Sequence, residues 1–331
     1  MENLTQRMEE VLIPFAMKLN ANRYLSAIRD GFVGVMSFLI IGSMFLLVAN
    51  FPIPGYADFM AGIFGAQWSY YITIPFGATM AILTLYVTMG IARRLAISYE
   101  LDEVSAVYIT LVAFIILTPM LTFDGAEGIS THALGAEGLF LGIITAIVSV
   151  ELLNYITKKG WEIKMPETVP ENVSRSFSTL IPATLIIIFF LLIRIGFALT
   201  SYETLQNFIF TILQTPLLAL GETIFARLIV TTFEQVLWIF GLHGPNIAGS
   251  VMAPVYQTLT NENAANFLQG LPPTNIMTLQ FHEIFVKIGG SGGTLPLAVL
   301  MIFTSKSDQY RELGKLSLAP GLFNINEPII F

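Results

Sequence analysis

The chain has 331 residues, of which 54% are hydrophobic and only 12% are charged, and its formal net charge is −7. Soluble domains carry about 25% charged residues, so the composition excludes an ordinary soluble protein and predicts an all-α polytopic membrane protein. The dilute negative charge gives no reason to expect a nucleic-acid partner. The absence of cysteine excludes disulfides, thiolate catalysis and thiolate-bound metal on this chain.

Residues 1–30 are predicted to form a cytoplasmic amphipathic segment. They contain no uninterrupted apolar core and therefore do not resemble a signal peptide. Apolar residues recur at helical spacing through the first 20 residues, with charged residues on the other side. This pattern is typical of a helix lying along a membrane surface, and an ordinary cytoplasmic cap is the alternative.

Five apolar runs follow, each long enough to span a bilayer. They are expected at 31–50, 71–91, 105–121, 136–156 and 179–200. None shows the period-two alternation of a membrane strand. Lysine and arginine fall in every second connection, which predicts a cytoplasmic N-terminus and a multi-pass protein. We expect residues 31–200 to form a five-helix scaffold and dimerisation domain.

Residues 201–331 are predicted to form a substrate-binding transport domain with re-entrant or broken helices. Four breaker clusters divide this half, namely GLHGPN at 241–246, LPPTN at 271–275, GGSGGT at 289–294 and LAPGLFNINEP at 318–328. Irregular backbone in a bilayer is tolerated only where protein buries it or a watery cavity reaches it. Short, Gly/Pro-interrupted segments mark transporter sites. Plain loops are the alternative, above all for GGSGGT, which lacks the Gly-Lys-Ser/Thr ending of a P-loop.

Glu327 and His243 are the main candidate site residues. Glu327 precedes Pro328 in NINEP, which pushes it away from helical geometry. A carboxylate at membrane depth costs about 2.5–3.5 kcal/mol and must be paired or hydrated. His243 lies between Gly241 and Pro245 in GLHGPN, where no regular helix continues. The alternatives are a carboxylate in a hydrated loop and a structural histidine.

Further polar and aromatic candidates lie near the same breaks. They are Trp238, Asn246, His282, Asn324 and Asn326. Trp238 offers a face on which a pyranose ring can stack, with a core tryptophan as the alternative. The histidines and glutamates lack HExxH or comparable spacing, so neither a metal nor another cofactor is expected. Glu222, Arg227 and Glu234 in one apolar run indicate either an intramembrane ion-pair network or a polar path.

The motifs GLHGPN and NINEP, in this topology, resemble the sugar-transporting EIIC subunit of the bacterial phosphoenolpyruvate:sugar phosphotransferase system, in its lactose/cellobiose/diacetylchitobiose family. The resemblance covers essentially the whole chain. It implies a homodimer in the bacterial inner membrane, whose first five helices form the interface. The later helices and two hairpins would then form a moving transport domain.

The resemblance also implies a function. The subunit would bind a β-linked disaccharide (diacetylchitobiose foremost, or cellobiose or lactose) and carry it inward. A cytoplasmic IIB partner, charged through IIA, would phosphorylate the 6-hydroxyl from a phosphocysteine. Glu327 would accept the hydroxyl proton, and His243 would hold the hydroxyl or stabilise the phosphoryl charge. This chain would be a subunit of the phosphotransferase complex and not catalytic alone.

One feature of the sequence departs from this family, and two other functions are alternatives to the one it implies. Members of the family continue beyond NINEP, which predicts that further sequence follows PIIF. The IIB docking surface is therefore placed only among candidate segments at 92–104, 157–178 and 305–316.

A proton- or ion-coupled sugar transporter using Glu327 as carrier is the first alternative function. An intramembrane enzyme acting on a lipid-linked sugar is the second.

Overall fold

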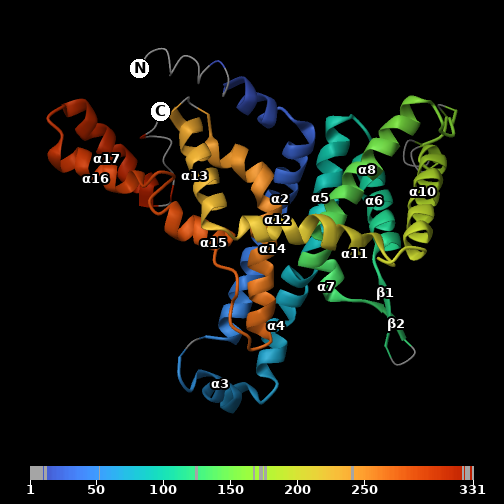
Figure 1. The fold of residues 1–331 in the computed structure, drawn as a ribbon, viewed down its shortest axis with the longest axis horizontal. Helices are drawn as coiled ribbons and strands as arrows, with labels where there is room; N and C mark the ends of the chain where they lie inside the picture. The colour runs from blue at the N-terminus through green and yellow to red at the C-terminus, as the bar shows by residue number, and fades with distance from the viewer. Residues whose placement is uncertain are drawn as a thin grey trace. The chain divides into compact units, whose positions relative to one another are not determined.

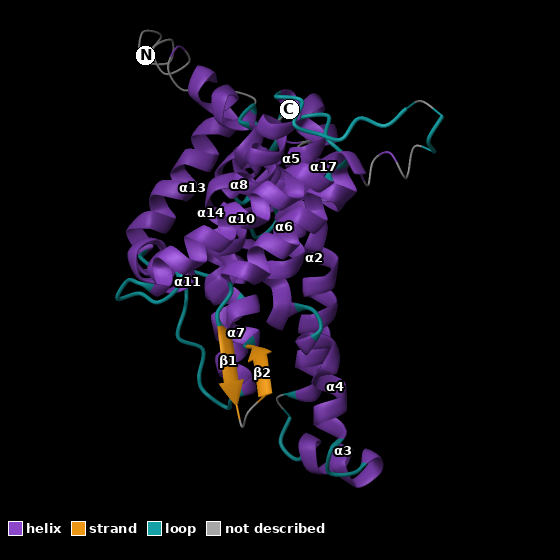
Figure 2. Cartoon of the chain, turned by 90° about the vertical axis from the view of Figure 1, so that its right-hand side faces the viewer, coloured by secondary structure: helices purple, strands orange, loops and turns teal. Residues whose placement is uncertain are grey.

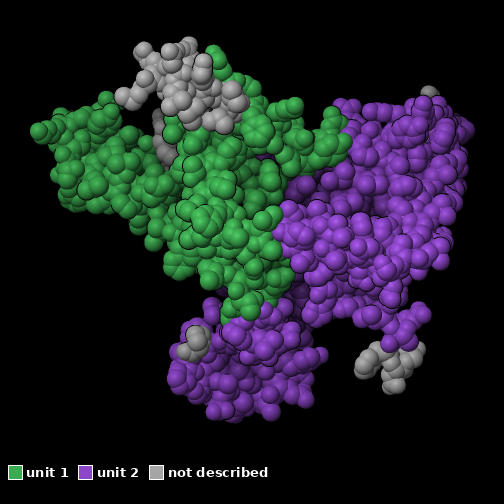
Figure 3. Space-filling view, viewed as in Figure 1, with its two compact units in different colours: residues 1–25, 218–263, 273–331 green, residues 26–217, 264–272 purple. Residues whose placement is uncertain are grey.

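The computed structural model describes residues 10, 13–51, 53–123, 126–166, 168–170, 174, 177–239, 242–322, 324 and 329. These residues are mainly helical (Figure 1). They form two compact units (Figure 3). Unit 1 comprises residues 1–25, 218–263 and 273–331, and unit 2 comprises residues 26–217 and 264–272.

Unit 2 is built mainly from long apolar helices. In chain order its elements are α2 (Arg23–Ala49, which begins in unit 1), α3 (Tyr56–Phe64), α4 (Trp68–Gly77), η1 (Met80–Ile82), α5 (Leu83–Ser98), α6 (Glu103–Leu117), β1 (Met120–Phe123), β2 (Ala126–Ile129), α7 (Thr131–Leu134), η2 (Ala136–Gly138), α8 (Leu139–Lys158), α10 (Leu180–Ala198), α11 (Leu205–Ile209) and η3 (Phe210–Gln214). Helices α5, α6 and α8 pack on one another, and α10 packs on α6 and α8.

The core of unit 2 lies where α5, α6 and α8 meet. Leu83, Ile91, Phe114 and Leu141 are completely buried there. Gly142 sits directly against Thr88 and Thr84, and an added Cβ would approach Thr84 Cγ2 to 2.8 Å. Helix packing within one chain therefore accounts for the small residue at position 142.

The long apolar helices coincide with most of the predicted spans. Among the described residues, four helical stretches are long and apolar enough to cross a membrane, namely Arg23–Ala49, Trp68–Ser98, Ala136–Lys158 and Leu180–Ala198. A fifth appears if Leu205–Gly221 and Ile224–Ile239 count as one broken span. The predicted all-α membrane fold, with a broken helix pair, is confirmed.

The predicted span at 105–121 is shorter in the structure. Helix α6 has 15 residues and ends at Leu117, whereas a straight span needs about 20. Thr118 precedes Pro119 and is extended, with φ −71° and ψ 136°, because a residue before proline avoids helical geometry. The chain then enters a hairpin that the sequence did not predict (Figure 2). In it β1 pairs antiparallel with β2, with Met120 opposite Ile129 at one end and Phe123 opposite Ala126 at the other.

Unit 1 contains helices of very different lengths, separated by breaks. Its elements, with one beginning and another ending in unit 2, are α12 (Thr215–Gly221), α13 (Ile224–Ile239), α14 (Gly244–Leu268), α15 (Leu279–Phe281), η4 (His282–Val286, a π-helical turn), α16 (Thr294–Thr304) and α17 (Asp308–Leu322). Residues 13–20, here named the N-terminal helix, also belong to this unit. Helices α16 and α17 pack together as a hairpin.

Helix α14 is longer than the sequence suggested. The run IAGSVMAPVYQTL read as a short, interrupted segment, but it lies inside one helix of 25 residues that passes through Pro254. Pro245 is the second residue of this helix, in the first turn, where a proline costs no hydrogen bond. The break at GLHGPN is therefore confined to the residues before Gly244.

Candidate functional site

One face of α13 gathers the polar and aromatic side chains of the candidate site. Helix α13 begins after Thr223, whose hydroxyl accepts a hydrogen bond from the Ala226 N–H at 3.1 Å. Arg227, Glu234 and Trp238 follow at spacings of seven and four residues, which place them on one side of a helix. All three are buried, whereas Phe225 and Ile229 are exposed. The sequence pattern alone thus separates a polar inner face from an apolar outer one.

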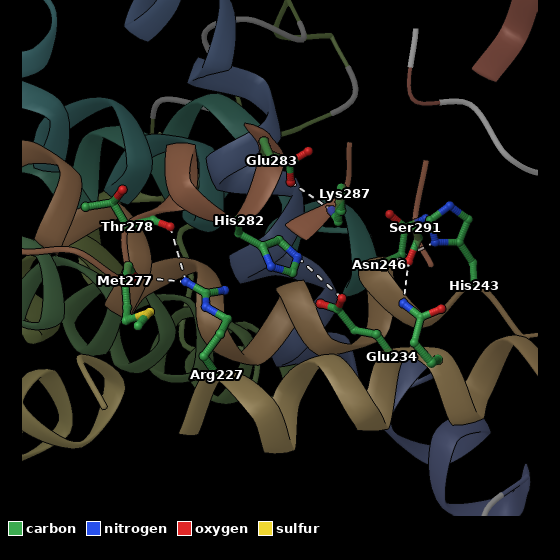
Figure 4. Close-up of polar contacts among 11 residues, drawn as sticks. Arg227, Glu234, His243, Asn246, Met277, Thr278, His282, Glu283, Lys287 and Ser291 are labelled. Carbon is green, nitrogen blue, oxygen red and sulfur yellow. Dashed lines mark hydrogen bonds and ion pairs between the residues drawn. The ribbon is translucent and has the colours of Figure 1, made fainter. Parts of the chain in front are cut away.

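A deeply buried polar contact joins Glu234 to His282. Their Oε2 and Nε2 atoms lie 3.3 Å apart, and each side chain is only 4% exposed (Figure 4). His282 is the first residue of the π-helical turn η4, and single π-helical turns occur frequently at functional sites. Because buried charge is tolerated only when it is paired, this contact fixes η4 against α13.

Arg227 fixes the segment before η4. Its Nη2 donates to the carbonyls of Met277 at 2.9 Å and Thr278 at 3.2 Å (Figure 4). The guanidinium carbon lies 3.7 Å from the centroid of the Tyr256 ring on α14, which is a cation–π contact. Arg227 therefore holds α13, α14 and the residues before α15 together.

Several buried polar atoms in this cluster make no hydrogen bond to another described residue. They are Nε and Nη1 of Arg227, the hydroxyl of Tyr256, Nδ1 of His282 and Oε2 of Glu234, whose 3.3 Å approach to His282 is an ion-pair distance. Buried polar atoms are nearly always paired, so each exception needs an explanation. The guanidinium provides donors, the carboxylate an acceptor and the hydroxyl both, and the imidazole nitrogen donates or accepts according to its tautomer, a set that suits a hydroxyl-rich ligand.

The glycine loop, GGSGGT at 289–294, contacts both α13 and the NINEP segment. Gly289, Gly290 and Gly292 have φ values of 72°, 101° and 87°, which favour glycine. Oδ1 of Asn324 accepts hydrogen bonds from the N–H groups of Gly289 at 2.8 Å and Gly290 at 3.3 Å. Ser291 Oγ accepts one from Gln235 Nε2 of α13 at 2.8 Å.

The histidine of GLHGPN lies beside the same helix. The His243 and Trp238 rings have centroids 4.7 Å apart and are tilted by 48°. His243 Nδ1 accepts a hydrogen bond from the Asn246 N–H at 3.2 Å (Figure 4). A Cβ at Gly244 would lie 2.7 Å from the Glu234 carbonyl carbon, so only glycine lets α14 start this close to α13.

The structure thus brings most of the predicted site residues to α13. Trp238, His243 and Asn246 lie together, His282 pairs with Glu234, and Asn324 reaches the glycine loop. The close-up in Figure 4 shows the contacts that converge on α13. Asn326 and Glu327 lie outside the described residues.

Of the two arrangements predicted for the run that holds Glu222, Arg227 and Glu234, the ion-pair network is not found among the described residues, and the polar path stays a prediction. Glu234 pairs with His282, Arg227 donates to main-chain carbonyls and Glu222 is exposed, so the described residues do not form the suggested network among these three. Gln235 and Ser291 were not singled out at all. The spacing along α13 was a usable signal for Arg227 and Glu234, whereas nothing local marked their ion-pair and hydrogen-bond partners, which lie 48 to 51 residues away.

Known proteins give a consistent match. A family model described as "Phosphotransferase system, EIIC" matches residues 29–331. The "PTS system cellobiose-specific EIIC component" of Geobacillus stearothermophilus is 41% identical, covering all of this chain and 76% of that protein. The "Lichenan permease IIC component" of Bacillus subtilis (strain 168) is 42% identical, covering all of this chain and 75% of that protein.

A solved structure shares the fold. It is that of the transporter ChbC, the IIC component of the N,N'-diacetylchitobiose-specific phosphotransferase system, which is 39% identical with a TM-score of 0.93. The likeness covers 98% of this chain and 77% of that one. The family match spans more than nine tenths of the sequence, and the identities exceed what fold similarity alone would give. This chain therefore belongs to the EIIC family of the phosphotransferase system.

Proposed function

We propose that this chain carries a β-linked disaccharide, diacetylchitobiose foremost and cellobiose next, across the bacterial inner membrane. Phosphorylation of its 6-hydroxyl by a phosphocysteine IIB partner completes the transfer, and IIA recharges IIB. Support comes from relatives whose names refer to cellobiose and N,N'-diacetylchitobiose, at 41% and 39% identity over nearly the whole chain.

The observation that carries the proposal is the convergence of separate breaks on one helix face. Arg227, Glu234 and Trp238 of α13 contact the segment before α15, the turn η4 and His243 respectively. A sugar needs donors, acceptors and an apolar ring face at the same place. Guanidinium, carboxylate, imidazole and indole groups meet that need in an otherwise apolar chain.

Glu327 and His243 take the chemical roles in this proposal. Phosphoryl transfer requires an in-line nucleophile, and a carboxylate that accepts the hydroxyl proton both orients and activates it. Glu327 is the proposed base. His243 donates to the hydroxyl or to the developing phosphoryl charge. Asn324, the first residue of NINEP, accepts a hydrogen bond from the Gly289 N–H of the glycine loop at 2.8 Å. Ser291 of the same loop contacts α13, so the loop connects the start of NINEP to that helix.

An uptake experiment in sealed vesicles tests the proposal. Vesicles that hold this chain are loaded with phosphorylated IIB and offered each disaccharide outside. We expect intravesicular 6-phosphosugar that requires IIB. Unmodified sugar that accumulates with a proton gradient and without IIB would instead establish a proton-coupled transporter. Consumption of a lipid-linked sugar without any cytoplasmic partner would establish an intramembrane enzyme.

Substrate choice is tested by titration. Isothermal titration of the purified protein with diacetylchitobiose, cellobiose and lactose ranks the three ligands directly. We expect diacetylchitobiose to bind most tightly, with cellobiose second. Tightest binding of lactose would contradict the proposed specificity.

We also propose a homodimer. Helix α10 leaves most of its apolar side chains uncovered, including Leu192 and Ile195, a surface that suits either lipid or a second copy. Light scattering of the detergent-solubilised protein separates the two, because a dimer doubles the protein mass. A monomer at all protein concentrations would contradict the proposal.

A further inference from the structure

The N-terminal helix, residues 13–20, packs on the outside of the break that carries His243. Ala16 is completely buried in an apolar cluster with Leu237 of α13 and Ile247 of α14. Leu19, Phe233 and Leu242 complete this cluster. The rings of Phe15 and Phe233 meet edge to face, 6.5 Å apart. One short helix therefore contacts the chain both before and after the break.

The apolar cluster and the candidate site alternate along the sequence. Leu237 precedes Trp238, Leu242 precedes His243, and Ile247 follows Asn246. These three residues of the apolar cluster are thus direct neighbours of site residues. Because adjacent side chains move with a common backbone, a displacement of the cluster is passed on to the site.

Backbone hydrogen bonds make this connection stiff. The Leu242 N–H donates to the Leu237 carbonyl at 3.0 Å, and the Ile247 N–H donates to the His243 carbonyl at 3.3 Å. The His243 ring is itself held by Trp238 at 4.7 Å and by the Asn246 N–H. Leu242 also packs against the cluster that holds Ala16 of the N-terminal helix.

We propose that the N-terminal helix is a positioning element of the sugar site, with Ala16 and Leu19 as positioning residues that act through His243. This rests on the proposed function, because it assumes that His243 contacts the sugar. The helix touches no sugar in this proposal. It sets the place of the imidazole, and Ala16 is small because α13 and α14 leave no space for a larger side chain.

The test compares Ala16→Phe with Met17→Phe on the neighbouring position. Met17 is 59% exposed and Ala16 is 0% exposed, so the same ring is added once into the cluster and once into the surroundings. Overpacking shifts the backbone, and we expect disaccharide affinity to fall about tenfold for Ala16→Phe and by less than about twofold for Met17→Phe. Leu19→Ala removes packing instead of adding it, and it should also lower disaccharide affinity. If Ala16→Phe does not fold, the affinity of Leu19→Ala tests the proposal in its place.

A double variant shows whether the effect passes through His243. If it does, Ala16→Phe in a His243→Ala background lowers affinity by less than about twofold more, because the two losses are not additive. Additive losses would overturn the positioning role. The obvious competing explanation, a general loss of stability, lowers the folded fraction but not the affinity of the folded molecules.

A second readout does not depend on transport or sugar binding. The chain has 3 tryptophans, so replacing Trp68 and Trp161 by Phe leaves Trp238 as the only tryptophan, which is excited selectively at wavelengths that tyrosine does not absorb. We expect its emission in the Ala16→Phe and Leu19→Ala variants to shift towards that of His243→Ala, and to stay unchanged in Met17→Phe. Unchanged Trp238 emission in folded Ala16→Phe and Leu19→Ala would overturn the inference, even if His243 proved to have no part in sugar binding.

Discussion

The two units bury polar groups in different ways. Both units bury threonines and serines, and some of these hydroxyls donate within their own helix, as Thr118 of unit 2 does to the Phe114 carbonyl and Thr258 of unit 1 to the Pro254 carbonyl, each at 2.8 Å. Among the described residues, however, the buried ionisable side chains Arg227, Glu234 and His282 all lie in unit 1, and their partners include residues far away in the sequence. A hydroxyl can be satisfied by its own helix at little cost, whereas buried ionisable groups are costly and persist where they have a specific role. The comparison therefore supports the proposal that the chemistry lies in unit 1.

The largest expected effect concerns Glu327→Gln in unit 1. The amide keeps a hydrogen bond to the sugar but cannot accept its proton, so we expect phosphorylation by IIB to fall about 100-fold or more while affinity changes by less than about threefold. The measurement combines a phosphosugar assay with titration. Glu222→Gln, at an exposed carboxylate of the same unit, is the control and should keep both values. A wild-type rate for Glu327→Gln would remove it as the base.

Loss of the buried Glu234 carboxylate should come next. Glu234→Ala leaves His282 without its acceptor inside the protein, which we expect to cost about 3 kcal/mol of stability and to abolish most sugar binding. Thermal unfolding in detergent and titration measure the two effects. The counterpart in unit 2 is Glu151→Ala, because Glu151 accepts from Tyr99 and is only half-buried. That variant should keep sugar binding, and a loss equal to that of Glu234→Ala would break the distinction between the units.

A matched pair of arginines sharpens the comparison further. Arg194 of unit 2 donates to the carbonyls of Ile116 and Thr118 at 2.6 and 2.8 Å, as Arg227 of unit 1 does to Met277 and Thr278. Replacement by Met should destabilise the protein by about 2 kcal/mol in each case. Only Arg227→Met should weaken disaccharide binding of the folded protein in a titration. Equal binding by both variants would show that the α13 cluster is purely structural.

The smallest effect is expected for Asn324→Ala. This change removes the oxygen that accepts from Gly289 and Gly290, and we expect both a loss of about 1 kcal/mol in stability and an affinity drop of about fivefold. Asn207→Ala in unit 2 is the matched control, because its side chain donates to the Tyr202 carbonyl on an exposed surface. Unchanged titration curves for Asn324→Ala would disconnect NINEP from the glycine loop in function.

The sequence determined the class of the protein and most of the places where helices break, although α17 continues through Pro320 to Leu322, into the break predicted at 318–328. Low charge and long apolar runs predict membrane helices, because a bilayer accepts little else. The sequence did not predict that α6 ends at Leu117, before Pro119, because a continuous apolar stretch gives no sharp helix boundary. The motif resemblance at GLHGPN and NINEP supplied the family, which the comparisons confirm.

Only the tertiary structure decided which partners the polar residues have. The spacing of polar residues along a helix predicts which face is polar. It does not predict which of several distant segments packs against that face. Glu234 pairs with His282 and not with Arg227. Asn324 accepts hydrogen bonds from two residues of the glycine loop, 34 and 35 positions earlier. The N-terminal helix, expected along the membrane surface, buries Ala16 against Leu237 and Ile247. Such choices depend on shape and packing between segments, which local spacing does not encode.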